Sequence, residues 1–99
     1  MKYVFHPDAL TEYAEAVKYY ANQNREIAQA FINSIEDAVY RIRESATRYP
    51  EIDEDVRRCM SRKFPYAVLY SIEQDYLLII AVMHCSREPN YWKNRKSSD

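Results

Sequence analysis

The most informative absence in this chain is glycine, which does not occur once in its 99 residues. Phosphate-binding loops of the P-loop and Rossmann kinds depend on glycine, because the backbone itself must approach the phosphate closely. The sequence therefore excludes the usual nucleotide-binding sites of those two kinds.

Cysteine and long apolar runs are also scarce. The two cysteines, Cys59 and Cys85, make no disulfide framework, so we expect a reducing, cytoplasmic setting. Residues 1–7 lack a signal-peptide hydrophobic region, and no apolar run approaches the roughly 20 residues of a membrane-spanning helix. We therefore expect no membrane partner. The cysteines and histidines match no common zinc spacing, so we expect neither a metal nor any other cofactor.

The charges that are present are unevenly placed. Residues 1–55 hold 6 Lys and Arg against 11 Asp and Glu, a balance of −5. Residues 56–96 hold 8 against 3, a balance of +5, and the whole chain has a formal net charge of −1. The total argues against a generic polyanion binder, but the basic half favours a negatively charged partner.

The first half of the chain predicts a strand and two helices. Lys2–Phe5 is a short extended run, and Pro7 suits the first turn of a helix. Apolar residues recur at helical spacing from Leu10 to Ala21, and a second helix is expected from Arg25 to about Ala46. Its apolar face is expected to hold Ile27, Phe31, Ile35, Ala38 and Ile42. So short a turn between two helices predicts an antiparallel hairpin.

The second half of the chain predicts an acidic connection at residues 51–55 and then three strands. The strands are expected at residues 56–63, 67–73 and 76–84. Leu77–Val82 has no polar alternation, which indicates a central strand with both faces covered. The order β-α-α-β-β-β predicts an α+β fold, with a helical hairpin packed on one face of a small, mainly antiparallel sheet. We expect one domain over residues 1–92 and a frayed tail over residues 93–99.

Four motifs follow one another along the chain. They are Phe5-His6-Pro7-x-Ala9, Tyr19-Tyr20, Arg62-x-Phe64-Pro65-Tyr66-x-Val68-x-Tyr70, and Ala81-Val82-x-His84-x-x-Arg87-x-Pro89-x-Tyr91-Trp92. In this order and spacing they resemble the RelE/ParE superfamily of bacterial toxins over nearly the whole chain. The resemblance implies the toxin of a type II toxin–antitoxin pair, neutralised by a small antitoxin encoded beside it and reaching operator DNA only through that antitoxin. Some members of the superfamily cut mRNA in the ribosomal A site, some poison DNA gyrase, and some have no demonstrated target.

The resemblance also allows the RNA-cleaving function to be tested position by position. Members that cleave RNA carry basic residues on the sheet face away from the helices. Arg58 and Arg87 match two of these positions, but Met60 and Ala67 occupy two others. Because losing one cation beside a reacting phosphate costs roughly 10²-fold in rate, the set is depleted.

A catalytic set is still conceivable around His84, whose neutral imidazole can act as a base near pH 7. Under the RNase hypothesis that set is His84, Arg87, Arg58 and Tyr91. The structural alternative is a histidine hydrogen-bonded to the tail, which fixes the turn at residues 89–92 against the sheet. Non-RNase branches of the superfamily resemble this chain at His84, which favours the structural alternative.

The sequence therefore favours a ParE-like toxin that binds a protein target such as DNA gyrase, without chemistry of its own. The alternatives are a ribosome-dependent mRNA interferase and an inert toxin-fold protein that only binds its antitoxin. Residues expected to contact the target or the antitoxin are Arg57, Arg58, Arg62, Lys63, Tyr66, Arg87 and Trp92. Strand alternation predicts that Arg58, Met60 and Arg62 share one face. We expect the antitoxin to use a groove between the helices and the sheet, or an open sheet edge.

Overall fold

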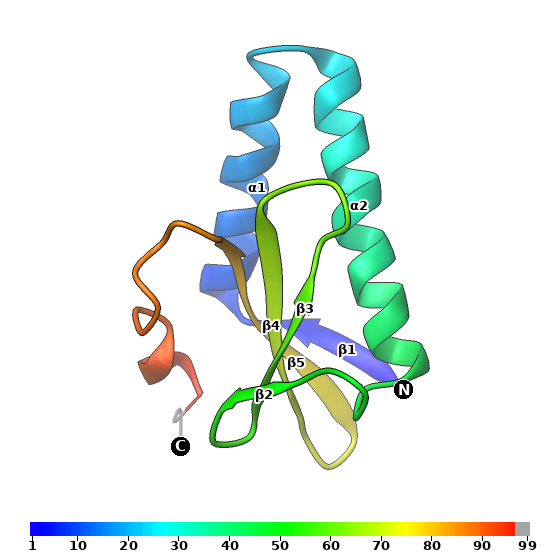
Figure 1. Cartoon of the computed structure of the whole chain (residues 1–99), viewed down its shortest axis with the longest axis vertical. Helices are drawn as coiled ribbons and strands as arrows, with labels where there is room; N and C mark the ends of the chain where they lie inside the picture. Colours follow the sequence, from blue (N-terminus) through cyan, green and yellow to red (C-terminus); the bar gives the residue numbers. More distant parts are fainter. Residues whose placement is uncertain (97–99) are drawn as a thin grey trace.

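Two helices and five strands make up residues 1–96, the part of the chain that the computed structural model describes. In chain order the elements are β1 (Lys2–Phe5), α1 (Pro7–Ala21), α2 (Arg25–Glu44), β2 (Glu51–Asp53), β3 (Val56–Met60), β4 (Tyr66–Ile72), β5 (Tyr76–His84) and a short 3-10 turn, η1 (Lys93–Arg95). Both helices lie over one face of the sheet (Figure 1), so the predicted α+β fold is confirmed.

Side-chain caps explain where the helices begin. The Nδ1 atom of His6 accepts a hydrogen bond from the backbone N–H of Asp8 at 3.0 Å, and Pro7 occupies the first turn of α1. The Oδ1 atom of Asn24 accepts from the backbone N–H of Glu26 at 2.7 Å at the start of α2. Each cap satisfies an amide that has no partner inside the helix. The predicted hairpin is confirmed, since α1 and α2 lie side by side (Figure 1).

Three details of the helical prediction were wrong. The second helix ends at Glu44 and not at Ala46. Leu10 and Ile27, expected on the apolar faces, are both exposed. Ile27 lies one helical turn before the buried Phe31, near the start of α2, where the helical hairpin extends beyond the strands (Figure 1).

The strands form a single sheet in the order β1-β5-β4-β3-β2, in which β1 runs parallel to β5 and all other pairs are antiparallel. The prediction that Leu77–Val82 forms a central strand is confirmed, because β5 lies between β1 and β4. Residues 51–55 are not a plain connection, since Glu51–Asp53 pairs with β3 as an edge strand. β3 ends at Met60, three residues earlier than expected.

Apolar side chains cover the sheet on both faces. On the face toward the helices, hereafter the helix face, Phe31 and Ile35 pack with Leu77 and Ile79. On the opposite face, hereafter the outer face, the buried cluster consists of Val56, Ala67, Leu69, Ile80, Ala81 and Trp92. The C-terminal segment therefore supplies the cover that the helices give on the other side.

A bulge in β5 decides which side chains point to which face. Leu69 of β4 pairs with Ala81, whereas Tyr70 pairs with Ile79, so Ile80 is an extra residue in β5. Ile80 and Ala81 consequently both pack on the outer face. Side chains of a strand normally alternate between its two faces, and an extra residue reverses that alternation for every residue after it. The residues of β5 after Ile80 therefore point to the faces opposite to those that an unbroken strand would give.

A partly buried ion pair ties the C-terminal segment to α1. The guanidinium of Arg95 donates to Glu12 Oε1 at 3.0 Å and to Oε2 at 2.9 Å, and also to the Ile80 carbonyl at 3.1 Å. The N–H of Val82 donates to the same Oε1 at 3.0 Å. Because β1 pairs with β5 only as far as Ile79, these side chains satisfy the edge of β5 that β1 leaves open.

The C-terminal segment differs from the sequence prediction. We expected fraying from Lys93 onward, whereas Lys93–Arg95 forms η1 and the Arg95 side chain is only 10% exposed. The reason is the pairing with Glu12, an interaction too distant in sequence to be visible as a local pattern. The part of the prediction that concerns residues 97–99 lies outside the described residues.

Within residues 1–96, neither α1 nor α2 combines the length and the apolar character that crossing a bilayer requires.

We expect Glu12→Ala to lower the free energy of unfolding by about 3 kcal/mol, because it leaves the buried Arg95 guanidinium and the Val82 amide without their acceptor. Urea denaturation followed by circular dichroism measures the change. Glu15→Ala, an exposed glutamate on the same helix, is the matched control and should change stability by less than about 0.5 kcal/mol. Equal effects of the two substitutions would contradict this role of Glu12.

Candidate functional site

The outer face carries the positions at which RNA-cleaving relatives are expected to hold cations. Arg58 pairs with Leu69 and Met60 pairs with Ala67, so all four side chains point to the outer face. Arg58 and Met60 are exposed, and Met60 retains 42% of its accessible surface, whereas Ala67 is fully buried. Of these positions on β3 and β4, only Arg58 carries a positive charge, and its exposed neighbour Met60 is apolar.

His84 lies on the other side of the sheet. Its partner across the β4–β5 pair is Tyr66, which belongs to the helix-face core. The two rings are arranged edge to face, with their centroids 5.0 Å apart. The bulge at Ile80 accounts for this placement. Arg58 and His84, predicted together as a catalytic set, are therefore on opposite faces of the sheet.

The hydrogen bonds of His84 bear on its capacity as a base. The Nδ1 atom accepts from the backbone N–H of Ser86 at 3.0 Å and lies 2.8 Å from the Ser86 hydroxyl. With the Nδ1 lone pair used in this way, the neutral ring carries its proton on Nε2 and has no second free lone pair. This bond to the segment after β5 agrees with the structural interpretation of His84.

A shallow hollow of about 210 Å³ surrounds His84 where α1 faces the end of β5. Its polar lining includes Arg87, Glu12 and Glu15, together with the ring of Tyr19. Because Arg95 already pairs with Glu12, the remaining charges are those of Glu15 and Arg87, and the hollow has no net positive charge to attract a phosphate.

Tyr91 is held under two arginines. The guanidinium of Arg87 lies 3.9 Å from the centre of the Tyr91 ring, and that of Arg95 lies 5.0 Å from it. Burial and the neighbouring Glu12 carboxylate raise the pKa of the Tyr91 hydroxyl above its usual value. A tyrosine with a raised pKa is a weaker acid near pH 7, which limits its use as a proton donor.

The predicted contact residues do not form one surface. Arg57 points to the helix face, where its guanidinium donates to the carbonyls of Thr47 and Tyr49 at 3.2 and 2.7 Å. Tyr66 and Trp92 are buried, Trp92 with only 2% of its surface exposed. These three side chains hold the fold together and offer little surface to a partner.

Arg62 was expected beside Arg58 and Met60, and this expectation was wrong. β3 ends at Met60, and the turn that follows bends toward α2. The Nε atom of Arg62 lies 3.9 Å from a carboxylate oxygen of Asp37 on α2.

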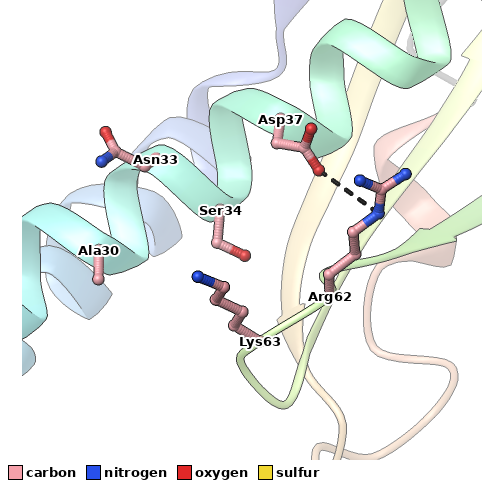
Figure 2. Close-up of a pocket in the computed structure, with 6 residues that line it drawn as sticks. All are labelled: Ala30, Asn33, Ser34, Asp37, Arg62 and Lys63. Atoms are coloured by element: carbon pink, nitrogen blue, oxygen red, sulfur yellow. Dashed lines mark ion pairs between the residues drawn. The ribbon is translucent and has the colours of Figure 1, made fainter.

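A second hollow, of about 290 Å³, lies between α2 and the turn that joins β3 to β4 (Figure 2). It is lined by Ala30, Asn33, Ser34, Asp37, Arg62 and Lys63. Of these residues, the sequence had pointed to Arg62 and Lys63. The other four residues lie on α2. The spacing of the polar ones among them matches no motif, and they form a site only because α2 packs against the turn.

Within residues 1–96, no three His, Cys, Asp or Glu side chains gather in a way that could hold a metal ion.

Comparison with known proteins identifies the class to which the fold belongs. The family described as the ParE toxin of the type II toxin–antitoxin system, parDE, matches residues 3–89. The chain belongs to the ParE toxin family. The superfamily expected from the motifs is thereby confirmed.

A solved structure is similar to this chain over most of its length. A chain of the chromosomal ParDE TA system from P. aeruginosa superimposes with a TM-score of 0.74 at 15% sequence identity. The match covers 85% of this chain and 95% of that chain, and it shows a shared fold. A search of curated proteins found no match.

We expect Arg57→Gln to lower the free energy of unfolding by about 1 kcal/mol, because the substitution removes charge-assisted hydrogen bonds to two loop carbonyls. Arg58→Gln removes the same charge from the exposed neighbouring position and should change stability by less than about 0.5 kcal/mol. Urea denaturation of both variants measures the difference. If Arg58→Gln were as destabilising as Arg57→Gln, the assignment of the two arginines to different faces would be contradicted.

Proposed function

We propose that the chain is the toxin of a type II pair that is neutralised by a cognate antitoxin and acts by binding a protein target such as DNA gyrase. The observation that carries this proposal is the placement of Arg58 and His84 on opposite faces of the sheet.

The chemistry of RNA cleavage explains why this placement matters. Cleavage needs a base for the 2′-hydroxyl, cations for the phosphorane and an acid for the leaving 5′-oxygen, all within hydrogen-bond reach of one phosphate. The sheet lies between Arg58 and His84, so the two side chains do not meet at a single phosphate. Met60 and Ala67 add no charge on the outer face.

The outer face has the composition of a protein-binding surface. Exposed Met60 and Arg58 lie next to each other on one side of β3. Arginine and methionine are both enriched where proteins bind each other, and the cation favours an acidic partner. We propose that these two residues lie at the centre of the surface that engages the target.

The edges of the sheet support the antitoxin part of the proposal. β1 and β2 are edge strands, and each carries an exposed apolar side chain, Val4 on β1 and Ile52 on β2. An open edge with apolar side chains invites an added strand or an amphipathic helix. In this proposal the chain reaches operator DNA only through the antitoxin.

We expect induction of the chain alone in a bacterial host to stop DNA synthesis before protein synthesis, as measured by pulse-labelling over the first minutes. His84→Ala should remain as toxic as the unchanged chain, because His84 does not act as a base in this proposal. Arg58→Glu should lose toxicity, since it reverses the charge of the proposed contact. Lys18→Glu, a charge reversal at an exposed lysine of α1, is the matched control and should stay toxic.

Other outcomes would favour the alternative functions. If protein synthesis stopped first and His84→Ala were harmless, the chain would be an mRNA interferase. If neither synthesis changed while a partner still bound, the chain would be a toxin fold without a toxin's activity.

We also expect the chain made alone to be recovered in low yield or as oligomers, because its edge strands are unpaired. Co-expression with the small open reading frame beside its gene should restore host growth and yield a soluble complex. Size-exclusion chromatography and growth curves measure the two effects. A harmless, monodisperse chain obtained alone at high level would count against a toxin held by an antitoxin.

A further inference from the structure

The hollow between α2 and the β3–β4 turn lies outside the target-binding surface proposed above, yet most of its lining is polar. Figure 2 shows Arg62 and Lys63 extending from the turn toward α2, Arg62 toward Asp37 and Lys63 on the side of Ser34. Two adjacent basic side chains thus reach one helix face across an open space of about 290 Å³.

A buried serine, Ser34, lines this hollow and is paired with a second buried serine, Ser61. Ser34 of α2 and Ser61 of the turn are hydrogen-bonded through their hydroxyl oxygens, and Ser34 is only 7% exposed. Ser61 Oγ also accepts from the backbone N–H of Phe64 at 3.2 Å and of Lys63 at 3.4 Å. Because these amides occupy the lone pairs of Ser61, the proton of Ser61 goes to Ser34.

The hydroxyl proton of Ser34 then has no acceptor among residues 1–96. Ser34 lines the hollow, so an acceptor placed there would satisfy this buried donor. A buried hydroxyl without a partner costs free energy, and a ligand that supplies an oxygen atom recovers it.

The charged side chains that line the hollow determine whether a bound ligand should be positively or negatively charged. Asp37 is paired with Arg41 at 2.9 Å and lies only 3.9 Å from Arg62, so Arg41 already balances its charge. Within residues 1–96 no ion pair holds Lys63, so the ammonium and part of the Arg62 charge remain for a ligand. An anionic oxygen fits these donors.

We infer that this hollow binds the carboxylate of an acidic side chain carried by the antitoxin, an inference that rests on the function proposed above. Lys63 and Arg62 pair with the carboxylate, Ser34 donates to it, and the amide of Asn33 and the methyl of Ala30 contact the rest of the side chain. A single negative charge suits the site better than a phosphate dianion, because the uncommitted positive charge is that of Lys63 and only part of that of Arg62.

The test uses the full chain, made by cell-free synthesis and labelled with ¹⁵N, and two small probes at constant ionic strength and pH 7. The probes are N-acetylglutamate methylamide and its neutral counterpart N-acetylglutamine methylamide. We expect the glutamate probe to give saturable shifts of the Ser34, Lys63 and Phe64 amide signals, with the glutamine probe giving none at equal concentration.

Matched variants locate the binding. Lys63→Gln should weaken binding of the glutamate probe roughly tenfold, since it removes a charge-assisted hydrogen bond. Lys18→Gln removes an exposed lysine from α1 and should leave binding unchanged. Ser34→Ala should also weaken binding, and Lys63→Gln, at an exposed position, keeps the test valid if Ser34→Ala disturbs the fold.

Three results would overturn the inference: equal shifts with both probes, equal loss in Lys63→Gln and Lys18→Gln, or tighter binding of inorganic phosphate than of the glutamate probe. Neutralisation by the antitoxin is measured separately by growth. Failure of the probe to bind is therefore distinguishable from failure of the proposed function.

Discussion

The structure is organised by the need to cover β5 on both faces and along both edges. Its side chains are apolar in each direction, so the helices pack on one face and the C-terminal segment on the other. Along the edges, β4 pairs with β5 from Leu77 to His84 around the bulge, but β1 stops at Ile79. Glu12 and Arg95 complete the second edge with side-chain hydrogen bonds. A buried backbone amide needs a hydrogen-bond partner, and beyond Ile79 this ion pair supplies the hydrogen bonds that a longer β1 would have made.

The bulge at Ile80 connects this architecture to function. It lets Ile80 and Ala81 both cover the outer face, and it turns the end of β5 so that His84 faces α1. The same residue therefore improves the packing of the outer face and separates the histidine from Arg58. A chain with this bulge retains a cation on the outer face without a base beside it, which is the arrangement on which the proposed protein-binding function rests.

The features that could be predicted from the sequence are those that depend on interactions between residues close together in the chain. Pro7, the helical spacing of apolar residues and the apolar run of β5 are local patterns, and they predicted the elements within a few residues. The strand formed by Glu51–Asp53 depends on pairing with β3, and the order of η1 depends on Glu12. Arg62 was misplaced because alternation was extended beyond the end of β3. The motifs identified the superfamily, but the faces of the candidate residues depended on a bulge that no local pattern revealed.

The parallel pairing of β1 with β5 has a consequence for how the chain reaches this state. Lys2 pairs with Tyr76, and the first turns of α1 are tied to Arg95, so both ends of the chain are joined to elements distant in sequence. During synthesis the N-terminal strand leaves the ribosome long before its partner exists. The helical hairpin can form early, but the sheet closes only after the last strand and the C-terminal turn have emerged. Completion of the fold is thus delayed until the segment that carries Arg95 has been made.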